Sequence, residues 1–180
     1  GYKIIQNHTI ETDKVGRAQM LLVDGTAFTI GPNSSVTLDR FIYNPETADG
    51  SLEVTSRGLL RLVGGKVTKK TPAIIRTNAA TVGIRGGIAI VQTQGQSTKA
   101  AFVYGDQMTV TPTQNADGET TLTEDGFVVT VKNPTDDIEY PDLLTAESLS
   151  VLQEDLQAEE KDEEESEDEE EEEEGEESDE

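Results

Sequence analysis

Short alternations of apolar and polar residues run through the first 131 residues of the chain. In segments such as 26–30, 51–55 and 107–111, every second residue is apolar, which is typical of strands with one buried face. Turn-forming residues separate the segments about every 8–12 positions, as in sandwiches, barrels and β-solenoids. We therefore predict an all-β domain, an irregular β-solenoid or roll of about ten short strands, within 2–10, 17–23, 26–30, 35–43, 51–55, 57–63, 73–91, 98–104, 107–111, 120–123 and 127–131.

The segment 77–91 is predicted to be the central element of this domain. It ends in the apolar run 88–91, which indicates a buried strand. Gly83, Gly86 and Gly87 exclude a stable helix, since each glycine costs about 1 kcal/mol relative to alanine in a helix. They favour a backbone corner, a bulge or the close approach of another strand.

Several turns carry hairpin signals. Asp24-Gly25 is typical of a type I′ turn, in which both central residues have positive φ. Gly95 lies in a polar turn at 92–97. We also predict hairpins through Gly105-Asp106 and through 124–126.

The composition changes after residue 132, and this change predicts three parts. Residues 1–132 form the β domain, 133–157 form a linker with one short amphipathic helix, and 158–180 form a disordered Glu/Asp-rich tail. The helix places Leu144, Leu149, Leu152 and Leu156 near helical spacing, and Asp142 or Thr145 is expected to cap its start. We expect it to dock on the β domain or to meet a partner.

The extreme acidity belongs to the tail and not to the β domain. The whole chain has a formal net charge of −23, but residues 1–132 hold 13 Lys and Arg against 12 Asp and Glu, a net charge of +1. There is no cysteine, so disulfides, thiolate nucleophiles and cysteine metal sites are excluded. No stretch approaches the roughly 18–20 apolar residues of a membrane span, so we predict none in this chain.

Three ordered segments carry a family resemblance. Residues 15–34 contain the hairpin motif Asp24-Gly25-Thr26, residues 57–65 form a glycine-flanked strand, and residues 80–87 read ATVGIRGG. Together, over about residues 10–112, they resemble the FecR domain, first known from bacterial iron-transport signalling regulators. The motif positions are Asp24, Gly25, Gly83, Arg85, Gly86 and Gly87, with Gly87 where the family commonly has Thr.

The resemblance implies a solenoid-like β domain outside the cytoplasm, in the periplasm, at the cell surface or secreted, without enzymatic activity. Signalling members of the family add a cytoplasmic anti-sigma region and one membrane span. Neither is visible in this sequence.

Catalytic chemistry finds little support in the residues. His8 is the only histidine and is expected to be an exposed polar residue. Asp24, Asp39 and Asp106 could supply a carboxylate pair, but all three occupy turn positions, where Asp is favoured by local hydrogen bonds. Residues 83–87 superficially resemble a phosphate loop, but no helix follows. We predict no catalytic residues, no cofactor and no specific metal site.

A basic span is the main candidate for binding. No acidic residue lies between Glu53 and Asp106. If its cations share a face, they create a local positive potential suited to an anionic partner; otherwise β alternation scatters them. The aromatic residues that stack on nucleic acid are missing, so we expect no nucleic acid partner. The candidates are Arg57, Arg61, Lys66, Lys69, Lys70, Arg76, Arg85 and Lys99.

The acidic tail has three possible roles. It could only keep the protein soluble, it could bind divalent cations weakly through the carboxylates of 163–174, or it could cover the basic span and compete with an outside partner.

The sequence thus favours a non-enzymatic, extracytoplasmic binding or scaffold domain that recognises a protein or an anionic envelope polymer. The alternative is a sensor or regulator of cell-surface signalling that acts by protein–protein docking.

Overall fold

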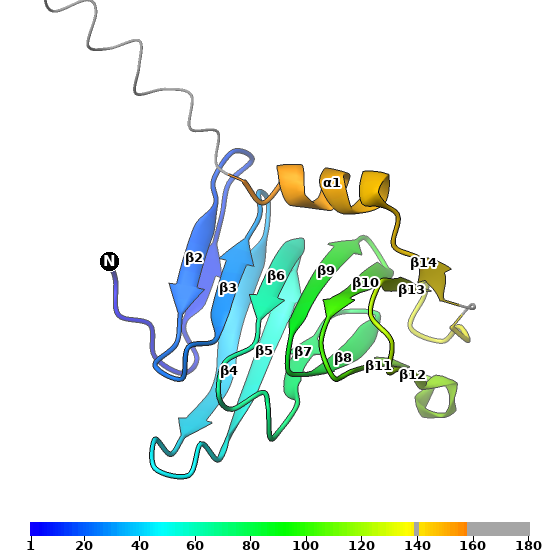
Figure 1. The fold of residues 1–180 in the computed structure, drawn as a ribbon. Coiled ribbons are helices and arrows are strands. Elements are labelled where there is room, and N and C mark those ends of the chain that lie inside the picture. The colour runs from blue at the N-terminus through cyan, green and yellow to red at the C-terminus, as the bar shows by residue number, and fades with distance from the viewer. Residues whose placement is uncertain (139–140, 158–180) are drawn as a thin grey trace, which may run out of the picture.

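The computed structural model describes residues 1–138 and 141–157. Within them, fourteen strands form two seven-stranded sheets, one 3₁₀ turn spans Ala116–Gly118, and one α-helix, α1, spans Ala146–Glu154 (Figure 1). Sheet A holds, in spatial order, β1 (Thr9–Glu11), β4 (Ser35–Tyr43), β5 (Gly50–Arg57), β7 (Ala73–Arg76), β8 (Ala80–Arg85), β11 (Gln107–Pro112) and β12 (Thr120–Leu122). Sheet B holds β14 (Asp142–Leu143), β13 (Phe127–Val131), β10 (Ser97–Tyr104), β9 (Ile88–Gln94), β6 (Leu59–Val63), β3 (Ala27–Ile30) and β2 (Ala18–Leu21).

In each sheet the strands follow their order along the chain, while the chain passes repeatedly between the sheets. Neighbours are antiparallel except β5 and β7, which are parallel. The predicted mostly-β fold is confirmed. In place of the predicted solenoid or roll, the structure has two facing open sheets, with fourteen strands in place of about ten, because the segment 73–91 divides into β7, β8 and β9 and β14 lies beyond the predicted domain.

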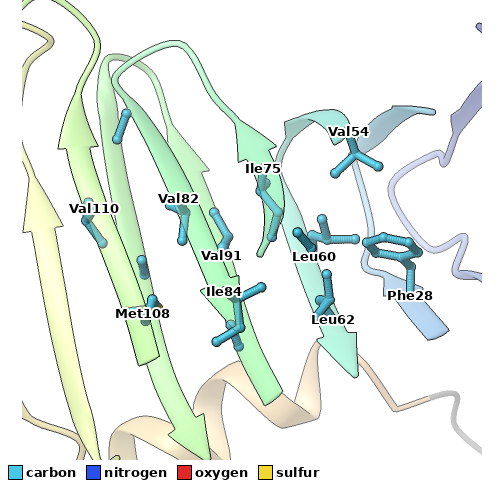
Figure 2. Packing of buried hydrophobic residues seen from close by; sticks show 14 of the residues in the cluster. Phe28, Val54, Leu60, Leu62, Ile75, Val82, Ile84, Val91, Met108 and Val110 are labelled. Carbon is cyan, nitrogen blue, oxygen red and sulfur yellow. The ribbon is translucent and has the colours of Figure 1, made fainter. Parts of the chain in front are cut away.

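The hydrophobic core lies between the two sheets. Alternate residues of each strand point to one face, so both sheets can bury one apolar face against the other. Figure 2 shows side chains from both sheets meeting in this layer. Sheet A contributes Val54, Ile75, Val82, Ile84, Met108 and Val110, and sheet B contributes Phe28, Leu60, Leu62 and Val91.

The segment 77–91 is a passage between sheets. Its first part is β8 in sheet A, and its apolar run 88–91 begins β9 in sheet B. Gly86 and Gly87 form the corner with φ of +58° and +96°. A Cβ at Gly87 would overlap the carbonyl oxygen of Tyr104, so both positive φ and close approach require glycine here. The predicted backbone corner is confirmed.

Other glycines mark passages that we predicted as hairpins. Gly105-Asp106 joins β10 in sheet B to β11 in sheet A, and Gly126 precedes β13 on the passage from β12. These two hairpin predictions are wrong, because the same glycine geometry serves a turn within one sheet and a passage between two. The turn at Gly95 does join the paired strands β9 and β10.

Asp24 ties the β2–β3 turn to the loop after β6. Its buried carboxylate accepts hydrogen bonds from the Thr26 amide at 3.0 Å, the Thr26 hydroxyl at 2.8 Å and the Val67 amide at 3.1 Å. β2 and β3 pair as a hairpin, but only Gly25 has positive φ, so the type I′ prediction is wrong. The side chain of Asp24 holds the turn instead.

We predict that Asp24→Ala lowers the free energy of unfolding by about 3 kcal/mol, because it leaves buried amide and hydroxyl donors without their charged acceptor. Asp39→Ala is the matched control: Asp39 accepts one exposed hydrogen bond from the Thr55 hydroxyl, so its loss should cost about 1 kcal/mol or less. Urea denaturation of the two variants measures both values. Equal losses would contradict the anchoring role of Asp24.

Candidate functional site

The outer face of sheet A is polar. Cross-strand pairing places six residues side by side in one row, and the hydroxyls of the first two are 2.7 Å apart. Such a face is well hydrated and needs no covering. The row consists of Thr9, Thr37, Thr55, Arg76, Thr81 and Thr111.

The outer face of sheet B carries a row of apolar side chains. Pairing across β2, β3, β6, β9 and β10 places five side chains in one row, here called the apolar row: Leu21, Ala27, Val63, Ile88 and Tyr104. Leu21 is 76% exposed and Tyr104 is 64% exposed, and the three between them are half-buried. The row is therefore a continuous apolar strip across five strands, open to solvent at both ends.

Helix α1 covers the neighbouring part of the same face. Leu156, buried, and Leu149 and Leu152, partly buried, pack with Leu59, Ile90 and other sheet B side chains in a second apolar cluster. Figure 1 shows α1 lying across the strands at one end of this sheet. The predicted helix and its docking on the β domain are confirmed.

Both ends of α1 are fixed by polar contacts. The Thr145 hydroxyl accepts a hydrogen bond from the Ser148 amide at 3.2 Å, so Thr145 is the N-cap and Asp142 instead lies in β14. At the other end, Arg17 Nε donates to the carbonyl of Asp155 at 3.0 Å. An arginine is well placed there, because the last carbonyls of a helix carry partial negative charge. Arg17 thus links the entry to β2 with the end of α1.

The basic span is distributed over three parts of the molecule. Arg76 and Arg85 lie on the outer face of sheet A, and Arg61 and Lys99 on that of sheet B. Arg57, at the end of β5, also lies on the outer face of sheet A, where it borders a cavity at one end of the sheets. Lys66, Lys69 and Lys70 share the loop between β6 and β7. The structure brings together only these three lysines, and binding of an anionic partner by the span stays a prediction.

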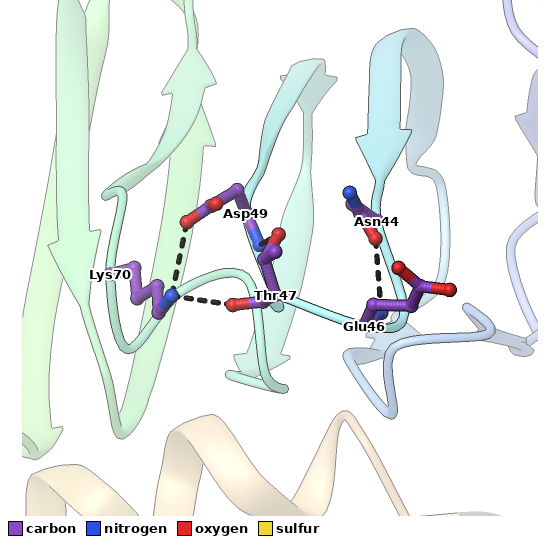
Figure 3. A network of polar contacts seen from close by, with 5 residues as sticks. All are labelled: Asn44, Glu46, Thr47, Asp49 and Lys70. Atoms are coloured by element: carbon purple, nitrogen blue, oxygen red, sulfur yellow. Dashed lines mark hydrogen bonds and ion pairs between the residues drawn. The ribbon is translucent and has the colours of Figure 1, made fainter.

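Two cations of the span have partners that the sequence did not reveal. Lys70 Nζ lies 3.0 Å from Asp49 Oδ1 and also donates to the carbonyl of Thr47 (Figure 3). The side chain of Thr47 and the ammonium group of Lys70 hold the pKa of Asp49 below its usual range. Arg76 lies 2.7 Å from Glu53 across the parallel pair β5–β7. Two acids that precede the acid-free interval in the sequence, Asp49 and Glu53, thus form ion pairs with two cations inside it.

Two adjoining cavities, of about 370 and 360 Å³, form a polar groove at one end of the sheets. They share Asn33, Gly58 and Thr93. The Thr93 hydroxyl accepts from the Gly58 amide, and the Ser34 hydroxyl accepts from the Leu59 amide at 2.8 Å. These hydroxyls hold the β5–β6 passage in place, so the polar lining has a structural use.

The candidate catalytic residues come from four different segments, and His8 pairs through its backbone with Leu38, the neighbour of Asp39. His8 is exposed beside β1, and Asp39 bonds to Thr55 on sheet A. Asp24 has its carboxylate engaged in the turn network, and Asp106 lies at the Gly86 corner. Among residues 1–138 and 141–157, no three His, Cys, Asp or Glu side chains gather as a metal site, and no helix has the length and apolarity to cross a membrane. The tail 158–180, with its proposed cation binding and cover of the basic span, lies outside the described residues.

The apolar row was missed by our sequence reasoning, although a signal existed. The runs at 59–63 and 88–91 are apolar on both strand faces, which indicates a strand that is covered on both sides. We predicted 88–91 as a buried strand and 57–63 as a glycine-flanked strand without asking what covers their second face.

Comparison with known proteins identifies relatives. The model of the FecR protein family matches residues 8–106. Two crystal structures described as a "putative anti-sigma factor" from Parabacteroides distasonis ATCC 8503 share the fold, with TM-scores of 0.59 and 0.58 at 18% and 17% sequence identity. Each alignment covers 79% of this chain, which spans 62% and 63% of those chains. None of the curated proteins matches the chain.

We predict that Leu156→Ala loosens α1. This leucine lies in the turn directly after the helix, and its buried side chain packs against sheet B. A nine-residue helix is marginal without tertiary packing, so amide exchange across α1 should accelerate about 30-fold, which corresponds to a loss of about 2 kcal/mol. Hydrogen exchange with mass spectrometry measures this, and the amides of β8 and β9 should stay protected. Val151→Ala, at an exposed position, is the control and should leave exchange unchanged. Unaltered exchange in Leu156→Ala would show that the docking contributes little.

Proposed function

The chain belongs to the FecR family, and on that premise we propose that it is a non-enzymatic protein-recognition domain of a signalling regulator that works outside the cytoplasm. The fold that it shares with a chain described as a "putative anti-sigma factor" supports a regulatory role. The extracytoplasmic placement is supported by the family resemblance, and the absence of cysteine is compatible with an oxidising compartment.

The apolar row is the observation that carries this proposal. The opposite sheet shows that the same architecture accommodates a hydrated threonine row, so apolar side chains are not required on an outer face. Contiguous exposed apolar surface with aromatic residues is typical of protein interaction sites. Leu21 and Tyr104 lie at its two ends, and Arg61 lies in the next row, so a polar rim is present as well.

The distribution of cations favours a protein over an anionic polymer as the partner. A polyanion binds best where positive charges share one face and reinforce one another. Here they lie on two opposite faces and one loop, and Lys70 and Arg76 already have acidic partners.

We expect the double variant Leu21→Ser/Tyr104→Ser to impair signalling in the organism that encodes the chain. Leu21 and Tyr104 are the most exposed side chains of the row, and loss of an aromatic anchor such as a tyrosine from an interface commonly costs about 2 kcal/mol, which weakens the affinity for the partner about 30-fold. Transcript profiles of the wild type, a gene deletion and the variant measure the effect, and the variant should reproduce most of the changes caused by the deletion.

Thr81→Ser/Thr111→Ser, on the outer face of sheet A, is the matched control and should resemble the wild type, with equal protein levels in immunoblots. A deletion that leaves transcription unchanged would remove the regulatory role. A normal profile for Leu21→Ser/Tyr104→Ser at normal protein level would remove the apolar row as the recognition surface.

A further inference from the structure

We propose that the apolar row binds an acidic amphipathic helix of the partner protein, which lies beside α1 on the outer face of sheet B. This inference rests on the proposed function and names the chemistry of the partner. Three features of the described residues carry it: the continuity of the row with the α1 interface, its length, and the charge of the surrounding face.

The row continues the surface on which α1 already lies. Leu59 lies in the row with Gln92 and Lys99, and Ile90 and Ala101 lie in the next row, with Arg61. α1 packs on these two rows, and the apolar row follows directly. Rows on one face are about 6.5–7 Å apart, and packed helices are about 8–10 Å apart. A second helix in contact with α1 would therefore have its axis over the apolar row.

The row also has the length of a short helix. It crosses five strands, and neighbouring strands are about 4.8 Å apart, so Leu21 and Tyr104 are separated by about 19 Å. A helix of about 13 residues spans this distance at about 1.5 Å per residue. Its pitch of about 5.4 Å nearly matches the strand spacing, so apolar residues at i, i+4, i+7 and i+11 can follow the row.

The charge of the face selects an acidic helix. The strands β2, β3, β6, β9 and β10 contain two charged residues, Arg61 and Lys99, and no acid. The helix that already lies on this face, α1, carries Glu147 and Glu154 and no basic residue. A second copy of this chain is a poorer occupant, because a symmetric contact would bring the same cations face to face.

The probe is a peptide with the sequence of the α1 segment, which already packs on this face of sheet B. Residues 142–157 of the chain are synthesised with a hydrocarbon staple between positions 146 and 150, both exposed, which compensates for the marginal stability of a free short helix. The probe is titrated to about 1 mM against the full-length, isotope-labelled chain, and NMR follows the methyl groups.

We expect saturable shifts at Leu21, Val63 and Ile88, with a dissociation constant below about 1 mM. Binding should weaken at least about 5-fold with Leu21→Ser/Tyr104→Ser, with added salt, and with a probe in which Glu147, Glu154 and Asp155 are replaced by Lys. Thr81→Ser/Thr111→Ser should bind as the wild type does.

Four results would overturn the inference. The first two concern the shifts: no saturable shift, or shifts confined to Leu59, Ile90 and Ala101, which would mean that the probe replaces α1. The other two are equal binding of the lysine probe, and a dimer of the chain formed through the row and detected by sedimentation. If the probe fails while Leu21→Ser/Tyr104→Ser still alters transcription, the proposed function stands and only the helical partner is rejected. If the variant leaves transcription unchanged at normal protein level, the apolar row is rejected as the recognition surface, and if the gene deletion leaves it unchanged, the proposed function fails; both results are independent of the probe.

Discussion

The burial of one apolar face from each sheet against the other is the interaction on which the rest of the structure depends. Phe28 and Leu60 from sheet B meet Val54 and Ile75 from sheet A in one continuous layer. Since strand side chains alternate with a period of two, this burial fixes which residues point outward on every strand. The two outer faces are then free to differ in chemistry, and they do: a row of threonines crosses sheet A, whereas an apolar row crosses sheet B.

The chain passes between the two facing sheets through short connections, and these connections have to fit close to neighbouring backbone. Gly86 and Gly87 pass beside Gly105 and the carbonyl of Tyr104, where a side chain would collide with backbone. Asp24 gives the loop after β6 a fixed partner, because its carboxylate reaches the amide of Val67. The family motifs therefore hold the passages and turns in place. Arg85, by contrast, is exposed on the outer face of sheet A.

Local patterns predicted most of the strands, because alternation and turn-forming glycines depend on near neighbours, but the strand predicted at 2–10 is wrong except for its last two residues, since β1 spans Thr9–Glu11. The helix, its apolar stripe and its N-cap at Thr145 were also within reach of the sequence. Sheet membership was not: Gly95 and Gly105 look alike in sequence, yet one turns within a sheet and the other leads to the opposite sheet. The pairing of Arg76 with Glu53 likewise depends on the parallel contact of β5 and β7, which joins residues 23 positions apart. The apolar row is a cross-strand feature, so no single segment shows it.

The relation between α1 and sheet B argues that the open row is a selected feature. A nine-residue helix has little stability of its own, so the apolar face of sheet B stabilises it, and the helix in turn removes Leu59 and Ile90 from water. One further helix width of the same apolar surface stays uncovered. Sheet A shows that this fold can place hydroxyls and a salt bridge on an outer face, at no cost to its core. Because exposed apolar strips promote unwanted association, the presence of this strip beside α1 is consistent with the proposed partner that covers it.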